Sequence, residues 1–130
     1  MSEDAFVFPA MPKVDVVRLL GVLAETQPGE WVAPGPVFVW LAEEDRDLYV
    51  DWEPQMVATL ERAVGQRPTW AVQINYRASC RDEMMTLTRA LMRSGGVAVD
   101  DFVDHVWTVE EIAADALVRS GRFGEPPVRR

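Results

Sequence analysis

The sequence has few of the residues that crosslink or catalyse in other small proteins. Cys80 is its single cysteine, so an internal disulfide and a cysteine-based zinc site are both excluded. His105 is its single histidine, which excludes the two-histidine HExxH metal motif. The patterns GxGxxG, GxxxxGK[ST] and GxSxG are missing as well. The fold must therefore be held by its core, and no motif identifies a reaction.

Long apolar runs are also missing. No stretch approaches the roughly 18 to 20 apolar residues that a membrane helix needs, and the opening MSEDAFVFPAMPK carries acids where a signal peptide carries a basic start. We therefore expect a soluble, cytoplasmic protein. A chain of 130 residues, 48% of them hydrophobic, suits one domain and is too short for two. We predict a single domain over residues 1–120, and a frayed tail over residues 121–130 because GRFGEPPVRR shows no periodicity.

Basic residues are scarce in the first half of the chain. Residues 1–65 contain 12 acids and 4 bases, whereas residues 66–130 contain 9 of each, and the net charge is −8. The acids concentrate in EEDRDLYVDWE, which contributes Glu43, Glu44, Asp45, Asp47, Asp51 and Glu53. Nucleic acids and anionic membranes are poor partners for such a surface, and a basic protein fits it better. The alternative is that the charge only keeps a small protein soluble.

Hydrophobic periodicity predicts alternating strands and helices. The expected elements, in chain order, are a strand at 5–9, a helix at 14–25, a surface loop at 27–36, a hairpin of strands 37–41 and 47–52, a helix at 54–64, a strand at 69–77, a helix from 79 to the glycines at 95–96, short strands at 97–101 and 105–107, and a helix from 108. Ser79 with Asp82, and Thr108 with Glu111, have the spacing of helix capping boxes.

This order predicts an α+β fold, with a mostly antiparallel sheet and its helices packed on one face. The first six elements match βαββαβ, the ferredoxin-like unit, and an αβα extension follows.

The acids and the histidine of VDDFVDHVW form one candidate site. Asp100, Asp101, Asp104 and His105 offer carboxylate and imidazole ligands for a metal ion. In an extended strand, however, Asp100 and Asp101 point to opposite faces. A polar turn at the end of a strand is the simpler interpretation, and we expect no bound cofactor or metal.

Cys80 and Trp31 are two further candidates. Cys80 near a helix start could be an activated nucleophile with His105 as its base, or a core residue in register with Met84 and Leu87. Trp31, in a predicted loop, is either an exposed anchor for a partner or a cover over the core edge.

Residues 70–112, WAVQINYRASCRDEMMTLTRALMRSGGVAVDDFVDHVWTVEEI, resemble small bacterial immunity-type proteins of polymorphic toxin systems. The resemblance lies in a long strand, the helix LTRALMRSGG, a hydrophobic strand ending in Asp-Asp and the helix after it. It implies a non-enzymatic protein that binds and blocks a cognate toxin, and it transfers no catalytic residue.

Three functions remain open at this point. The first is a non-enzymatic, cytosolic module that binds a basic protein through Trp31 and the acidic residues of EEDRDLYVDWE. The second is a small-molecule-binding or regulatory α+β domain that acts as a homodimer. The third is an enzyme that uses Cys80 and His105.

Overall fold

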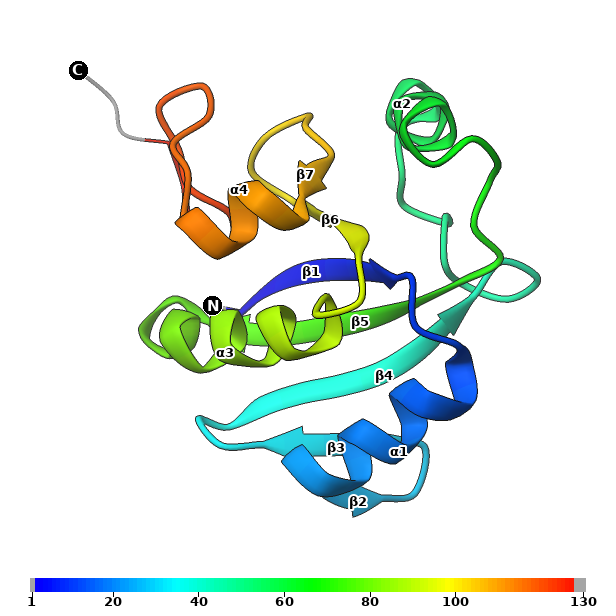
Figure 1. Ribbon diagram of the computed structural model, residues 1–130, viewed down its shortest axis with the longest axis vertical. Coiled ribbons are helices and arrows are strands. Elements are labelled where there is room, and N and C mark those ends of the chain that lie inside the picture. Colours follow the sequence, from blue (N-terminus) through cyan, green and yellow to red (C-terminus); the bar gives the residue numbers. More distant parts are fainter. Residues whose placement is uncertain (1, 128–130) are drawn as a thin grey trace.

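The computed structural model describes residues 2–127, which form an α+β fold (Figure 1). The strands are β1 (Ser2–Pro9), β2 (Glu25–Gln27), β3 (Glu30–Ala33), β4 (Val37–Glu43), β5 (Trp70–Arg77), β6 (Gly96–Asp100) and β7 (Trp107–Thr108). The helices are α1 (Lys13–Leu23), α2 (Pro54–Val64), α3 (Arg81–Leu91) and α4 (Val109–Ala114), with a short 3₁₀ helix at Ala78–Cys80.

The strands form one 7-stranded sheet in the order β2-β3-β4-β5-β1-β6-β7. Every neighbouring pair is antiparallel. The predicted α+β class with an antiparallel sheet is therefore confirmed. β1 lies between β5 and β6, so the first strand of the chain is an inner strand of the sheet.

Both faces of the sheet are covered by helices, each only in part. Successive side chains of a strand point to opposite faces, so β1 sends Ala5 and Val7 to one face and Phe6 and Phe8 to the other. Side chains of α1, α3 and α4 pack on the first face, which we call the α1 face. α2 packs on the second, the α2 face, and it stands apart from α1 and α3 in Figure 1. The prediction that all helices share one face is therefore wrong.

The ends of α2 follow their sequence signals. Pro54 occupies the first turn, where its missing N–H breaks no helical hydrogen bond. Gly65 ends the helix in the left-handed conformation with φ of 95°, which glycine adopts without steric cost.

The two predicted capping boxes have different outcomes. At α4 the Glu111 N–H donates to Thr108 Oγ1 at 3.2 Å, and the Thr108 N–H donates to Glu111 Oε1 at 2.9 Å, which confirms that box. At α3 no side-chain cap forms, because residues 78–80 are already in a 3₁₀ turn and the helix begins at Arg81.

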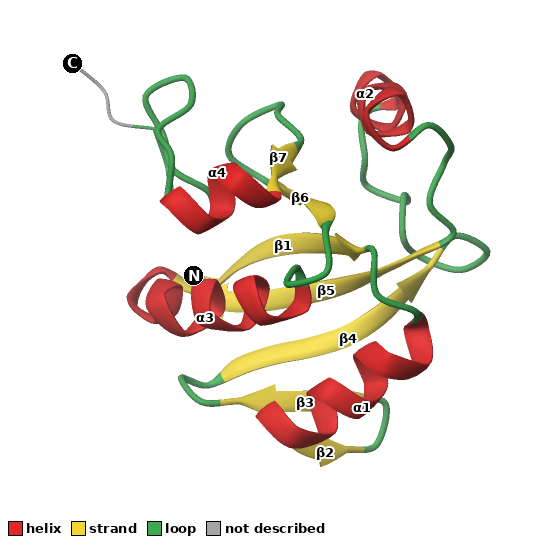
Figure 2. Ribbon diagram, viewed as in Figure 1, coloured by secondary structure: helices red, strands yellow, loops and turns green. Residues whose placement is uncertain are grey.

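The predicted hairpin of strands 37–41 and 47–52 is wrong. Residues 47–51 form turns and Trp52 has no regular structure, so this segment is part of the loop that joins β4 to α2 (Figure 2). Leu48 and Trp52 pack into the core under α2, whereas Val50 is 71% exposed. The alternation of apolar residues therefore reflects an irregular loop folded onto the α2 face. The Tyr49 hydroxyl fastens this loop by donating to the Pro68 carbonyl at 2.7 Å, and burial raises the pKa of Tyr49 to about 12.

The predicted loop at 27–36 instead contains a hairpin. β2 and β3 pair from Glu25↔Val32 to Gln27↔Glu30, around a turn that Gly29 enters with φ of 76°. Two extra strands thus precede β4, so the order of elements differs from the predicted βαββαβ start.

The predicted frayed tail is wrong over residues 121–127, and residues 128–130 lie outside the described part. Phe123 is 1% exposed and packs its ring edge-on to Trp107, with the ring centroids 5.9 Å apart. Arg81 donates to the Phe123 carbonyl through Nε at 2.9 Å and Nη2 at 2.7 Å. The segment is therefore part of the folded core, although its sequence has no periodicity.

Within residues 2–127, no helix has the length and apolar character needed to cross a membrane.

Candidate functional site

The six acids of residues 43–53 separate into paired and unpaired groups. Glu43 forms ion pairs with Lys13 and with Arg46, the latter at 3.8 Å. Glu44 faces Arg67 at 3.8 Å. The positive charge of these basic side chains offsets much of the field that Glu43 and Glu44 present to a partner.

The other four acids have no ion pair with any residue in the described range 2–127. They are exposed: Asp45, Asp47, Asp51 and Glu53. They therefore carry the uncompensated charge of this loop.

Asp47 and Asp51 line a surface hollow of about 230 Å³ together with Asp4 of β1 and Asp101, which follows β6. We call it the aspartate hollow, and its lining residues are Asp4, Phe6, Asp47, Leu48, Asp51, Trp52, Gln73 and Asp101. Phe6 and Trp52 stack edge to face beneath it, with ring centroids 5.3 Å apart. Because its charged lining residues are all acidic, the hollow favours a positively charged group.

The electrostatics of the hollow agree with this. Burial raises the pKa of Asp101, and the negative charge of Asp4 raises it further. The Asp4 N–H donates to Asp101 Oδ2 at 3.4 Å, and Asn75 donates to Asp4 Oδ1 at 3.0 Å. The carboxylates are thus held by neutral donors, which orient them and leave their charge uncompensated.

The structure does not bring the predicted cluster of Asp100, Asp101, Asp104 and His105 into one site. Asp101 faces the aspartate hollow, whereas Asp100 points to the α1 face, as the alternation along β6 requires. Asp104 is exposed, and its main-chain carbonyl accepts a hydrogen bond from Arg119. Within residues 2–127 no group of three or more Asp, Glu, His or Cys side chains is arranged to hold a metal ion.

The carboxylate of Asp100 anchors the backbone at residues 102–103 and at Gly124. Its Oδ1 accepts the N–H groups of Phe102 and Val103 at 3.1 and 3.2 Å, and its Oδ2 accepts the Gly124 N–H at 2.8 Å. Burial raises the pKa of Asp100, against these three hydrogen bonds, which lower it. The Tyr76 hydroxyl donates to the Gly124 carbonyl at 2.7 Å. Asp100 is therefore a structural residue.

His105 lies beside the start of α4. Its Nε2 is 2.9 Å from Glu111 Oε1 and 3.1 Å from Oε2, and its ring packs edge-on against Trp107. Although burial raises the pKa of Glu111, the hydrogen bonds from Thr108 and His105 lower it more. This contact joins the histidine to the capping box of α4.

Cys80 is 8% exposed and belongs to the α1-face core. A Cβ on Gly35 would lie 3.4 Å from its Sγ, which places the thiol against the turn between β3 and β4. His105 contacts Glu111 and Trp107 instead. The arrangement favours the interpretation of Cys80 as a core residue.

Trp31 lies in β3 rather than in a loop. It pairs with Val39 and packs, partly buried, against the α1-face core. It is thus on the face opposite the aspartate hollow, where it covers the core edge.

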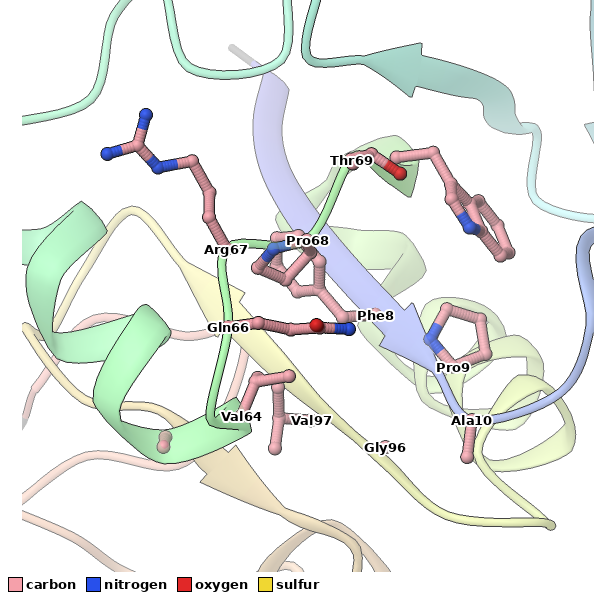
Figure 3. A pocket seen from close by; sticks show the side chains of 12 residues that line it. Phe8, Pro9, Ala10, Val64, Gln66, Arg67, Pro68, Thr69, Gly96 and Val97 are labelled. Carbon is pink, nitrogen blue, oxygen red and sulfur yellow. The ribbon is translucent and has the colours of Figure 1, made fainter.

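A second hollow, of about 520 Å³, lies between the end of α2 and the sheet (Figure 3). Its lining residues are Phe8, Pro9, Ala10, Ala63, Val64, Gln66, Arg67, Pro68, Thr69, Trp70, Gly96 and Val97. Gln66 points into it and Arg67 points away from it in Figure 3. Apolar side chains and polar groups both line it, and Arg67 is its one charged lining residue.

Sequence reasoning identified Asp47, Asp51 and Asp101 but missed Asp4, because the pairing of β1 with β5 and β6 brings it beside the others. The register Asp4↔Asn75 and Ala5↔Asp100 sets this position. The one local signal is that Asp4 and Phe6 alternate within SEDAFVFP and therefore share a face.

Comparison with protein-family models, with curated proteins and with solved structures found no match.

Proposed function

We propose that this protein is a non-enzymatic, cytoplasmic protein-binding module that holds a basic partner protein at the aspartate hollow. One observation carries the proposal: Asp4, Asp47, Asp51 and Asp101 line a single hollow whose lining contains no basic side chain. Complementary charge speeds encounter and selects against acidic partners. The same charge disfavours nucleic acids and anionic membranes.

The resemblance of residues 70–112 to immunity-type proteins suggests a toxin as the class of partner. Many toxins that attack nucleic acids are basic, and an acidic inhibitor surface fits them. An immunity protein needs no catalytic residue of its own, which agrees with a buried Cys80 and a His105 bonded to Glu111. In this role the protein neutralises the toxin by covering its basic surface.

The proposal is tested by capture with matched baits. The wild type and the D47N/D51N/D101N variant are immobilised and incubated with lysate of the source cell at low salt, and the retained proteins are identified by mass spectrometry. Each purified retained protein is then titrated against the wild type and the variant by calorimetry. We expect a basic protein that binds the wild type and loses roughly tenfold in affinity with the variant, because each exposed ion pair contributes about 0.2 to 1 kcal/mol.

The control variant D82N/E83Q/E110Q removes the same charge from exposed positions on α3 and α4. It should bind as the wild type does. Equal losses in both variants would show a general charge effect and contradict a local site.

The second candidate is a small-molecule-binding or regulatory domain that acts as a homodimer, and the hollow beside α2 favours it. Its volume of about 520 Å³ lies in the range of ligand pockets, and its lining combines apolar side chains such as Phe8 and Trp70 with polar groups. Native mass spectrometry separates the candidates: a dimer carrying a small molecule supports this one, whereas a ligand-free monomer that binds a basic protein supports the first.

A further inference from the structure

We propose that the basic partner docks on the part of the α2 face that α2 leaves uncovered, and that it does so through arginine side chains. This inference rests on the proposed function and extends its site from the aspartate hollow to the adjoining sheet. We call this surface the open face: an apolar strip of Val32, Phe38 and Trp40 with acidic residues on both sides.

The register of the strands assembles the strip. Val32 of β3 pairs with Phe38 of β4, and Phe38 pairs with Asn75 of β5. Trp40 pairs with Gln73, which also lines the aspartate hollow. The strip and the hollow are therefore continuous across neighbouring strands.

The two faces of β4 differ in burial. Val37 and Val39, on the α1 face, are fully buried, whereas Phe38 between them is 38% exposed. α2 packs its Met56 and Leu60 with residues at the other end of the α2 face, and Phe38 and Trp40 lie outside that cluster. An aromatic side chain in the middle of a sheet is thus left without a covering layer.

Acidic residues border the strip on both sides. Asp4 and Asp101 adjoin it through the aspartate hollow. Glu30 of β3 pairs with Gln27, and Glu25 of β2 pairs with Val32, so both glutamates point to the same face as Val32. Among residues 2–127, Arg77, paired with Ser2, is the basic residue that the strand register places on this face.

The negative charge around the open face decides between a second copy of this chain and a basic partner. A second copy that packed its own open face here would bring carboxylates against carboxylates, which is unfavourable. A basic protein surface would instead pair with Asp4, Asp101, Glu25 and Glu30 around the strip. The open face therefore fits a basic partner rather than a homodimer.

The combination of aromatic rings and carboxylates favours arginine over lysine. A guanidinium is planar, stacks on an aromatic ring and binds a carboxylate with two parallel N–H groups. An ammonium group is a compact, strongly hydrated charge and gains less from Phe38 and Trp40. Asn75 and Gln73 lie between the strip and the aspartates and offer amide oxygens to the remaining N–H groups.

The test uses a hexa-arginine peptide and a hexalysine peptide as probes, titrated by calorimetry at low salt. We expect the arginine peptide to bind roughly two- to fivefold more tightly, from a cation–π gain of about 0.5 to 1 kcal/mol at an exposed site. Phe38→Ser should weaken binding of the arginine peptide by a similar factor and weaken binding of the lysine peptide less. Val22→Ser, at a 78% exposed position on α1, is the matched control and should change neither.

Equal affinities for the two peptides, together with no effect of Phe38→Ser, would overturn the inference. If the captured partner protein binds Phe38→Ser normally but loses affinity with D47N/D51N/D101N, the inference is wrong and the proposed function stands. If neither variant changes its binding, both are wrong. A wild-type dimer in sedimentation that Phe38→Ser dissociates would also overturn the inference, in favour of self-association.

Discussion

Replacing Phe123 with alanine should destabilise the whole domain, although the residue lies in the last part of the chain. Phe123 is 1% exposed, and its ring packs against Trp107 in the α1-face core. Removing a buried phenylalanine side chain costs about 3 to 5 kcal/mol through lost transfer free energy and the cavity left behind. We expect a loss near the lower limit, about 3 kcal/mol, because residues 122–127 belong to no helix or strand and can shift to fill part of the cavity.

The anchors around Phe123 explain why the segment should not simply detach. Arg81 donates to the Phe123 carbonyl, and Tyr76 and Asp100 hold both polar groups of the Gly124 backbone. If the segment left, the hydroxyl of Tyr76 and the carboxylate of Asp100 would lose partners in a largely buried environment. Such losses cost about 1 to 3 kcal/mol each.

The measurement is urea unfolding followed by circular dichroism, with the free energy of unfolding extrapolated to water. Leu117→Ala is the control, because Leu117 is 58% exposed and its replacement should stay within about 0.5 kcal/mol of the wild type. A loss below about 1 kcal/mol for Phe123→Ala would show that residues 121–127 contribute little to the fold.

Two further predictions concern the candidate enzyme residue and the pH dependence of stability. Cys80, 8% exposed, should resist alkylation in the native protein and react once urea unfolds it; rapid native labelling would reopen the enzyme hypothesis. Arg81→Met should lower the free energy of unfolding at neutral pH by about 2 kcal/mol, measured by urea unfolding. Arg81 donates hydrogen bonds to Asp115, at 2.7 Å, and to the Phe123 carbonyl. The hydrogen bond from Arg81 lowers the pKa of Asp115. The stability that this ion pair contributes is therefore fully present above the ordinary aspartate pKa of about 4, and it is lost as the pH falls through the lowered pKa. The difference between wild type and variant should therefore shrink below about pH 4, and a difference independent of pH would contradict this role of Asp115.

The sequence predicts well those elements whose hydrophobic periodicity continues over many residues and whose ends carry clear signals. The helix α2 lies between Pro54 and Gly65, and β5 alternates over its whole length, so both were located correctly. Residues 47–52 alternate in the same way but form a loop, because burying Leu48 and Trp52 under α2 needs no strand partner. Local periodicity does not distinguish these two cases.

The candidate site was predicted only in part for a similar reason. Composition located the acidic loop, and Asp47 and Asp51 are in the hollow. Contacts between residues far apart in the chain decide the rest. They pair Glu43 with Lys13 and Glu44 with Arg67. They also place Asp4 and Asp101 beside Asp47 and Asp51. The burial of Phe123 has the same origin, since its neighbours Trp107 and Arg81 belong to other elements.

The central claim is that a basic partner covers the aspartate hollow, and carboxylate footprinting of the complex tests it most directly. The protein, alone and with its captured basic partner, is labelled at accessible carboxylates with a carbodiimide and an amine, and each site is quantified by mass spectrometry. The account predicts strong protection of Asp47, Asp51 and Asp101 in the complex and unchanged labelling of Asp82 and Glu83 at the start of α3. Unchanged labelling of the three aspartates, with protection at Asp82 and Glu83 instead, would contradict it.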